Sequence, residues 1–129
     1  MRFVMFMYAG AEERDYQPSA EDVEAMSRYN EELRKAGMLL ALDGLRPPAD
    51  GGTVEFAADG GATVSDGPYA EAKEVVGGYW LIQARSREEA LEWASRCPAR
   101  GGAIEVRRVA EIEDFPEDVQ RAVAANESA

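Results

Sequence analysis

Apolar residues occupy almost every position in three short runs of the chain, and this pattern indicates strands that are buried on both faces. The first run, FVMFMY at residues 3–8, combines aromatic and β-branched side chains and is followed by a loop signal at residues 9–10. A strand is therefore favoured over a buried helix. Two shorter segments flank the sequence DGG at residues 59–61, which is a hairpin signal. The predicted strands are residues 3–8, 38–42, 53–57, 62–65, 75–84 and 103–109.

Helical spacing of apolar residues appears between these strands. Ser19, with Asp22 three residues later, forms a capping box that satisfies backbone N–H groups at the start of a helix. Gly37 is expected to end that helix in a left-handed conformation. Ser86 and Glu89 repeat the capping signal before a second helix. The apolar face of the first helix is Val23, Met26, Tyr29, Leu33 and Ala36, that of the second is Ala90, Leu91, Ala94 and Cys97, and a short third helix is predicted over residues 117–124.

The order β-α-β, hairpin, β-α-β resembles the split βαβ, or ferredoxin-like, plan of an α+β protein. Crossovers of this kind are right-handed in about 98% of cases, so both helices are expected on one face of the sheet. One of two alternating apolar sets of the first strand then lies on the open face: Phe3, Met5 and Met7, or Val4, Phe6 and Tyr8. Such an exposed patch is unusual for a monomer. Either a second copy covers it in a two-fold pair, or the hairpin and the C-terminal tail fold back over it.

The charge balance narrows the classes of partner. The 129 residues include 14 Lys and Arg against 25 Asp and Glu, a formal net charge of −11, and the longest basic cluster is Arg107-Arg108. Binding to nucleic acid or to an anionic membrane needs a clustered basic patch, so neither partner is predicted. No run approaches the ~18 apolar residues of a membrane span, and no basic segment with a long apolar core precedes the first strand. The expected location is the cytoplasm.

The numbers of cysteine and histidine residues limit the disulfides, metal sites and catalytic bases that the chain can form. Cys97 is the single cysteine, and the chain has no histidine. An intrachain disulfide and an all-cysteine metal site within one chain are therefore excluded. An imidazole general base and a histidine metal ligand are excluded as well. Neither a metal nor a cofactor is predicted.

Residues 65–74 read SDGPYAEAKE and resemble the signature of the YCII-related family, whose usual form is Asp-Gly-Pro-Phe-Ala-Glu-Thr-Lys-Glu. Tyr69 replaces the usual phenylalanine, and Ala72 replaces the usual threonine. The resemblance covers residues 1–115, which are expected to form one domain. Residues 116–129 are then a tail with a short helix and a disordered end. Further similar segments are residues 29–33 (YNEEL), 36–37 (AG), 44–45 (GL), 78–80 (GYW), 96–98 (RCP) and 104–107 (IEVR).

The resemblance implies a dimeric α/β barrel made of two ferredoxin-like protomers, each with an inserted β-hairpin. It implies little about activity, because most members of the family have no assigned function. Some more distant relatives carry a His-Asp pair in a cleft and are thought to act on small molecules, one of them as a dehydrochlorinase. Members near this branch often read Gly-Leu-His-Pro where this chain has GLRP at residues 44–47. Arg46 cannot replace an imidazole base, because its guanidinium stays protonated, but it can grip a carboxylate or a phosphate.

Two acidic residues and one arginine are the main candidates for a site. Asp43 and Asp66 are the candidate proton acceptors, and Arg46 is the candidate anion clamp, because all three fall at strand exits or turns where ligand contacts are common. Residues 66–69 also fit a plain turn, and Asp43 with Arg46 also fits a surface ion pair. Further candidate ligand contacts on the signature segment are Tyr69, Lys73 and Glu74.

Three functions stay open on this evidence. The first is a small-ligand-binding or accessory homodimer, paired through its sheet face and taking a small anionic or aromatic ligand. The second is a metal-independent lyase or isomerase acting on a small acidic or aromatic compound, with Asp43 or Asp66 moving a proton. The third is a protein-interaction module. A carboxylate with a perturbed pKa in a closed cleft would favour the enzyme.

Overall fold

The computed structural model describes residues 1–9, 19–66 and 75–127, and every predicted helix and strand is present in it. The tail helix runs three residues beyond the predicted end, so residues 126 and 127 are helical. Two short 3-10 helices, η2 and η3, were not predicted. The elements are β1 (Arg2–Ala9), α1 (Ala20–Lys35), β2 (Leu39–Gly44), η2 (Pro48–Asp50), β3 (Gly52–Phe56), β4 (Ala62–Asp66), β5 (Val75–Gln83), α2 (Arg87–Ser95), β6 (Ala103–Arg108), η3 (Ile112–Asp114) and α3 (Glu117–Glu127).

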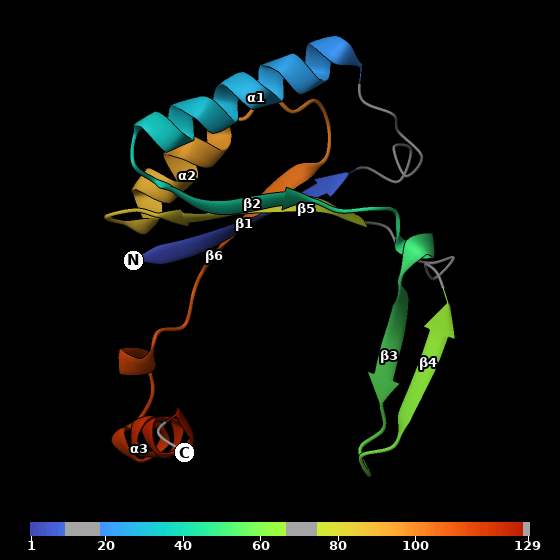
Figure 1. Cartoon of the computed structure of the whole chain (residues 1–129), viewed down its shortest axis with the longest axis vertical. Coiled ribbons are helices and arrows are strands. Elements are labelled where there is room, and N and C mark those ends of the chain that lie inside the picture. Colours follow the sequence, from blue (N-terminus) through green and yellow to red (C-terminus); the bar gives the residue numbers. More distant parts are fainter. Residues whose placement is uncertain (10–18, 67–74, 128–129) are drawn as a thin grey trace.

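The main sheet has four strands in the order β2-β5-β1-β6, and each neighbouring pair is antiparallel. This is the order of the split βαβ plan, so the α+β prediction is confirmed. Helices α1 and α2 lie on the same face of the sheet (Figure 1), as the right-handed crossovers require. Strands β3 and β4 pair only with each other and form a separate two-stranded sheet.

The core lies between the sheet and the two helices. Phe3 and Met5 of β1 point into it, together with Ile82 of β5 and Leu33 of α1, and each of these side chains is at most 2% exposed. Tyr29 is also buried; its hydroxyl donates to the backbone oxygen of Trp93 at 2.7 Å. The prediction that Tyr29 belongs to the apolar face of its helix is confirmed, and its ring meets the buried ring of Trp80 edge to face with centroids 5.9 Å apart. The polar atoms of the aromatic core are thus paired within the chain.

Capping sets the ends of α1 as predicted. The Ser19 hydroxyl accepts from the backbone N–H of Asp22 at 3.1 Å, and Gly37 follows the helix with φ +74°. The prediction that Val23 belongs to the buried face is wrong, because its side chain is 52% exposed. Packing against the core begins one turn later, at Met26, so the first turn of α1 contributes capping and little burial.

The face of the sheet opposite α1 and α2 is not covered by a helix of the described residues. Alternation along the strands places Val4, Phe6 and Tyr8 of β1 there, next to Tyr79 and Leu81 of β5, and all five side chains are only partly buried. We call this surface the open face. Figure 1 shows the β3–β4 hairpin and α3 extending from opposite ends of the sheet on this side, without lying across it. The alternative in which these two segments fold back over the face is therefore wrong.

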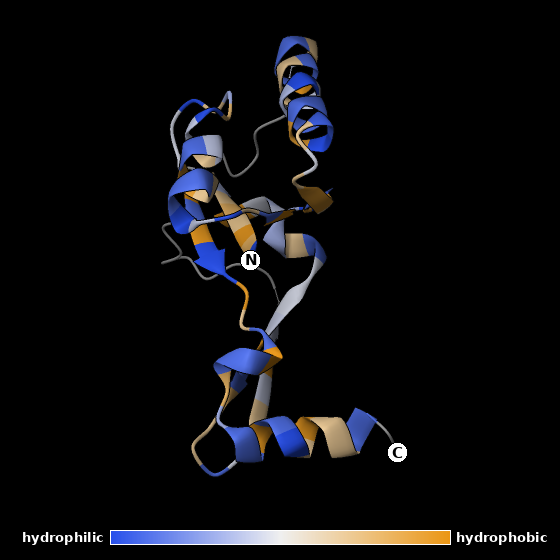
Figure 2. Ribbon diagram, turned by 90° about the vertical axis from the view of Figure 1, so that its left-hand side faces the viewer, coloured by the Kyte–Doolittle hydropathy of each residue, from blue (hydrophilic) through white to orange (hydrophobic). Residues whose placement is uncertain are grey.

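Hydropathy differs between the layers. In Figure 2, α1 is hydrophilic over most of its surface, whereas the strands of the main sheet carry many hydrophobic positions. Among the described residues, no helix combines the length and the apolar character that crossing a membrane would need.

Candidate functional site

Two glycines of β5 shape the edge of the open face next to β2. The pairing of β1 with β5 skips Gly77, since Met7 lies opposite Gly78 and Tyr8 lies opposite Val76. This is a β-bulge, which a pair of glycines inside an apolar strand favours. A Cβ atom on Gly78 would lie 2.9 Å from the backbone oxygen of Asp43. Only glycine therefore lets β2 and β5 approach so closely at the point where Asp43 leaves β2.

This close approach places Asp43 next to Tyr79. The two residues are opposite each other in the register of β2 and β5, and the Tyr79 hydroxyl donates to Asp43 Oδ2 at 2.7 Å. Both side chains lie on the open face, because Tyr79 alternates with the buried Trp80. The hydrogen bond to Asp43 raises the pKa of the Tyr79 hydroxyl. Tyr79 is therefore a protonated donor at neutral pH, and the carboxylate keeps a second oxygen for another contact.

A second tyrosine–carboxylate pair lies across the same face. The Tyr8 hydroxyl donates to Glu105 Oε1 at 3.1 Å, and Phe6 lies opposite both Glu105 and Tyr79 in the strand registers. One row across the sheet thus reads carboxylate, phenyl ring, phenol and carboxylate. An aromatic centre with a carboxylate at each side suits a small, flat, polar molecule better than it suits a long aliphatic chain.

One arginine joins this surface. Arg107 of β6 lies directly opposite Val4 and therefore on the open face. Its side chain forms no ion pair or side-chain hydrogen bond with another described residue. Arg107 and Glu105 were not predicted as site residues, although their alternation with Ile104 and Val106 in β6 is a signal that both point away from the core.

Arg46 has a different partner from the one considered in the sequence. Its Nε atom donates to Asp50 Oδ2 at 2.8 Å, and its side chain is 84% exposed. The ion pair considered between Arg46 and Asp43 is therefore wrong, since Asp43 accepts from Tyr79 instead. Arg46 lies where the chain enters η2, at the base of the hairpin.

Most of the signature segment lies outside the described residues. The backbone of Asp66 ends β4, where it pairs with Gly52. The side chain of Asp66, and all of Tyr69, Lys73 and Glu74, fall outside the part of the chain that the structure describes. The prediction that Asp66 and Arg46 share a pocket therefore stays a prediction.

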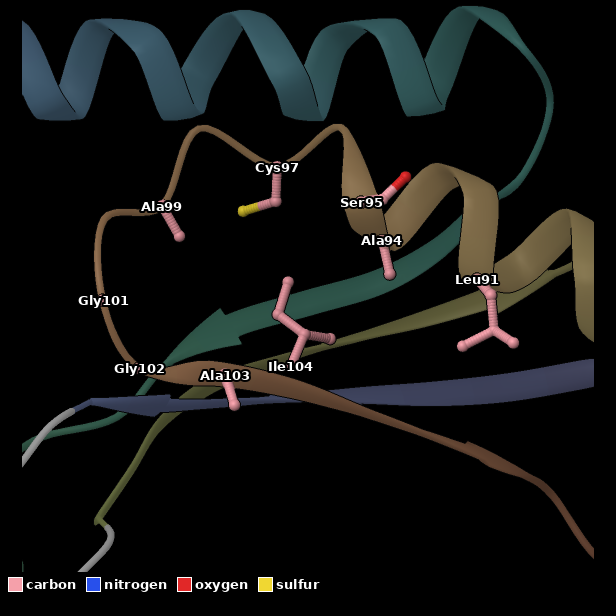
Figure 3. A pocket seen from close by; sticks show the side chains of 9 residues that line it. All are labelled: Leu91, Ala94, Ser95, Cys97, Ala99, Gly101, Gly102, Ala103 and Ile104. Carbon is pink, nitrogen blue, oxygen red and sulfur yellow. The ribbon is translucent and has the colours of Figure 1, made fainter.

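A separate hollow of about 430 Å³ lies on the helix side, between α2 and the start of β6. Figure 3 shows Ala94, Cys97 and Ile104 pointing into the same space. Its side-chain polar groups are already engaged, because the Ser95 hydroxyl donates to the backbone oxygen of Glu92 at 2.6 Å and Cys97 Sγ lies 4.0 Å from Met26 Sδ. Burial raises the pKa of the Cys97 thiol to about 11. This agrees with the prediction that Cys97 is a small hydrophobic residue and disfavours a nucleophile there.

Few side chains of the described residues are placed where they could serve together as metal ligands. The chain has no histidine, and among the described residues no three Cys, Asp or Glu side chains gather closely enough to hold a metal ion. The open face therefore presents hydrogen-bonding and aromatic groups as its chemistry.

Comparison with known proteins gives matches at the level of family and fold. The sequence profile of the YCII-related domain matches residues 1–113, a span that contains the whole main sheet and both helices that cover it. An uncharacterised protein of Rhizobium meliloti (strain 1021) is 37% identical over 88 residues, which make up 66% of this chain and 70% of that protein. A solved structure of 5-chloro-2-hydroxyhydroquinone dehydrochlorinase from Burkholderia phenoliruptrix AC1100, in complex with 2,5-dihydroxybenzoquinone, has a TM-score of 0.49 and 15% identity, covering 86% of this chain and 95% of that chain.

Proposed function

The chain belongs to the YCII-related family, and from that premise we propose that it is a homodimer that binds a small aromatic acid against its open face. The observation that carries this proposal is the 2.7 Å hydrogen bond between Tyr79 and Asp43 on a sheet face without a covering helix. A positioned phenol and carboxylate at the edge of an apolar surface are the polar groups that orient a small ligand.

The open face supports pairing with a second copy. Val4, Phe6 and Leu81 form an apolar centre that is only partly buried within one chain. Carboxylates flank this centre at Asp43 and Glu105, whereas Arg107 supplies the opposite charge. In a two-fold interface the same surface meets itself. A face that carries both signs of charge around an apolar centre is suited to such a contact, since each cation can approach a carboxylate of the partner.

The side chains of the face favour an aromatic acid as ligand. Phe6, Tyr8 and Tyr79 offer ring surfaces, and aromatic rings stack favourably on one another. Arg107 can hold a carboxylate through two parallel N–H bonds. We keep Arg46, Asp66 and the signature residues as a second candidate set, because the base of the hairpin continues from the edge of the face at Asp43. Those signature residues are Tyr69, Lys73 and Glu74.

Calorimetry with benzoate and 4-hydroxybenzoate tests the binding proposal. Replacing Tyr79 with Phe keeps the ring and removes the hydrogen bond that holds the Asp43 carboxylate in place, so we expect affinity to fall roughly 10- to 100-fold, as for the loss of a hydrogen bond to a charged group. Tyr8→Phe is the matched control, because it removes the other phenol of the same face, and it should change affinity by less than about threefold. Failure of both acids to bind the wild-type protein, or equal losses in both variants, would contradict the proposal.

The same hydrogen bond favours a second function, proton transfer by a metal-independent lyase or isomerase. The Asp43 carboxylate is accessible and is held in place by Tyr79, which is the geometry of a candidate general base. Incubation of bound 4-hydroxybenzoate in deuterium oxide, followed by NMR, tests this. Addition of a deuteron at the ring carbon next to the phenol, with loss of the phenol proton, gives a dienone, and Asp43 can then remove the hydrogen from that carbon to restore the ring. The wild type should catalyse exchange and Asp43→Asn should not. Binding without exchange would leave the protein as a ligand-binding dimer.

A further inference from the structure

The β3–β4 hairpin has one apolar face that nothing in the described chain covers. Val54 lies opposite Val64, and Phe56 lies opposite Ala62, so these side chains share one side of the hairpin. Val54, Phe56 and Val64 are 48%, 76% and 70% exposed. The alternate positions, on the other side, are Thr53, Glu55, Thr63 and Ser65. The hairpin is therefore amphipathic, with its apolar side open.

Among the described residues, the contacts that join the hairpin to the main sheet lie at its base. The bond from the Leu45 N–H to the Gly77 oxygen, 2.9 Å long, holds the entering segment against β5, and the Arg46–Asp50 ion pair joins two residues within that segment. Beyond that point, none of the hairpin residues belongs to the hydrophobic core. An isolated two-stranded hairpin is marginally stable in water. Both its stability and its exposed apolar side favour a covering surface beyond the described residues of this chain.

The length of the hairpin indicates where the surface that covers it lies. Each hairpin strand has five residues and so extends about 17 Å, whereas a sheet stacked on another lies only about 10 Å away. The hairpin extends from the end of the sheet on the side of the open face (Figure 1). A protein layer seated on that face therefore lies alongside the hairpin over its whole length.

Interface area favours a second copy as the occupant. Four strands, each about six residues long and about 4.8 Å apart, cover roughly 400 Å² in plan, whereas a standard interface buries roughly 800 Å² per partner. The sheet face alone falls short of a stable dimer. The hairpin, together with α3 at the other end of the sheet, supplies additional apolar surface, which on α3 includes the exposed Val119 and Val123. In a two-fold pair, both hairpins would be covered by the same association.

We infer that the hairpin is a clasp, which reaches past the edge of the partner protomer and buries Val54, Phe56 and Val64 against it. This inference rests on the homodimer of the proposed function and adds a second contact surface to it. The clasp also closes one end of the ligand site, because its base continues directly from Asp43 at the end of β2. The polar side of the hairpin, with Glu55, faces away from that contact.

Site-specific photocrosslinking tests the clasp directly. Phe56 is replaced by p-benzoylphenylalanine, and chains of normal and ¹⁵N isotopic composition are mixed before irradiation, so that mass spectrometry separates links between chains from links within one. We expect links between chains from position 56. The matched control places the same photoreactive residue at Glu55, on the opposite side of the hairpin, and should give few such links.

A second pair of variants measures the same contact without a crosslinker. Phe56→Ser should weaken dimerisation at least tenfold in sedimentation equilibrium, whereas Glu55→Ser should leave it within about threefold. A wild-type dimer that Phe56→Ser does not weaken, and that gives no link between chains from position 56, would overturn the clasp and leave the ligand-binding dimer standing. A wild-type protein that sediments as a monomer would overturn both.

Discussion

The two faces of the main sheet are built from alternate residues of the same strands, yet they have different environments. On the helix side, Phe3, Met5 and Ile82 are at most 2% exposed. On the open side, their sequence neighbours Val4 and Leu81 are apolar as well but only partly buried. Among the described residues, similar side chains of the same strands are thus covered by other parts of the chain on one face only. The apolar character of the open face therefore supports the proposed pairing with a second copy.

The hydrogen-bonding groups of the two faces also differ in their environment. On the helix side, the Tyr29 hydroxyl donates to a backbone oxygen and Trp80 Nε1 donates to Asn30 Oδ1 at 2.8 Å, which fixes the rings in the core. On the open side, Tyr79 and Tyr8 donate to carboxylates that stay accessible. Hydrogen bonds in the core consume donors and acceptors, whereas those on the open face orient carboxylates that can still contact another molecule. The hydrogen bonds of the helix side therefore stabilise the fold, whereas those of the open face are arranged for the proposed ligand contacts.

The largest expected effect is on the helix side. Leu33 of α1 is fully buried, so Leu33→Ala removes packed methyl groups and leaves a cavity. We expect the free energy of unfolding to fall by about 2–5 kcal/mol. Because the loss lies within one protomer, urea denaturation should give the same difference between variant and wild type at low and at high protein concentration.

A charge on the open face should act on association instead. Leu81→Asp places a carboxylate at the apolar centre of the face, next to Val4 in the strand register. We expect the dissociation constant of the dimer to rise by more than about 100-fold, because the new charge would be buried without a partner. Leu45→Asp is the matched control, since Leu45 is 50% exposed in the hairpin connection. Sedimentation velocity across a range of concentrations distinguishes the two, and an unchanged dimer in Leu81→Asp would place the interface elsewhere.

Local signals in the sequence predicted most of the fold. Period-two and period-3.6 patterns, the Ser19 capping box and the hairpin turn each depend on residues a few positions apart. The bulge at Gly77 could be predicted for the same reason, since a pair of glycines within an apolar strand is a local signal. Val23 shows the limit, because periodicity cannot tell where along a helix the contact with the sheet begins.

The site was harder to predict, because its pairs join distant parts of the chain. Tyr79 and Asp43 are 36 positions apart, and their contact depends on the register of β2 against β5, which is set by a bulge and by the close approach at Gly78. Asp43 could be proposed from its position at a strand exit, but its partner could not. Arg46 was matched to the wrong carboxylate, since Asp50 lies closer to it once η2 forms.

The smallest expected effect concerns the thiol on the helix side, and it contrasts a half-buried titratable group with the accessible carboxylates of the open face. Burial raises the pKa of Cys97 from 9.0 to about 11, so at pH 8 the folded protein should hold roughly 100-fold less thiolate than the unfolded chain. We expect iodoacetamide to modify folded Cys97 at least that much more slowly than the same residue in urea. Because the pKa is raised in the folded state, its contribution to stability is complete below pH 9 and is lost as the pH rises towards 11. Cys97→Ser should therefore flatten the decline of the thermal midpoint between pH 9 and pH 11. Rapid alkylation of the folded protein at pH 8 would contradict this and would show that the space between α2 and β6 opens to solvent.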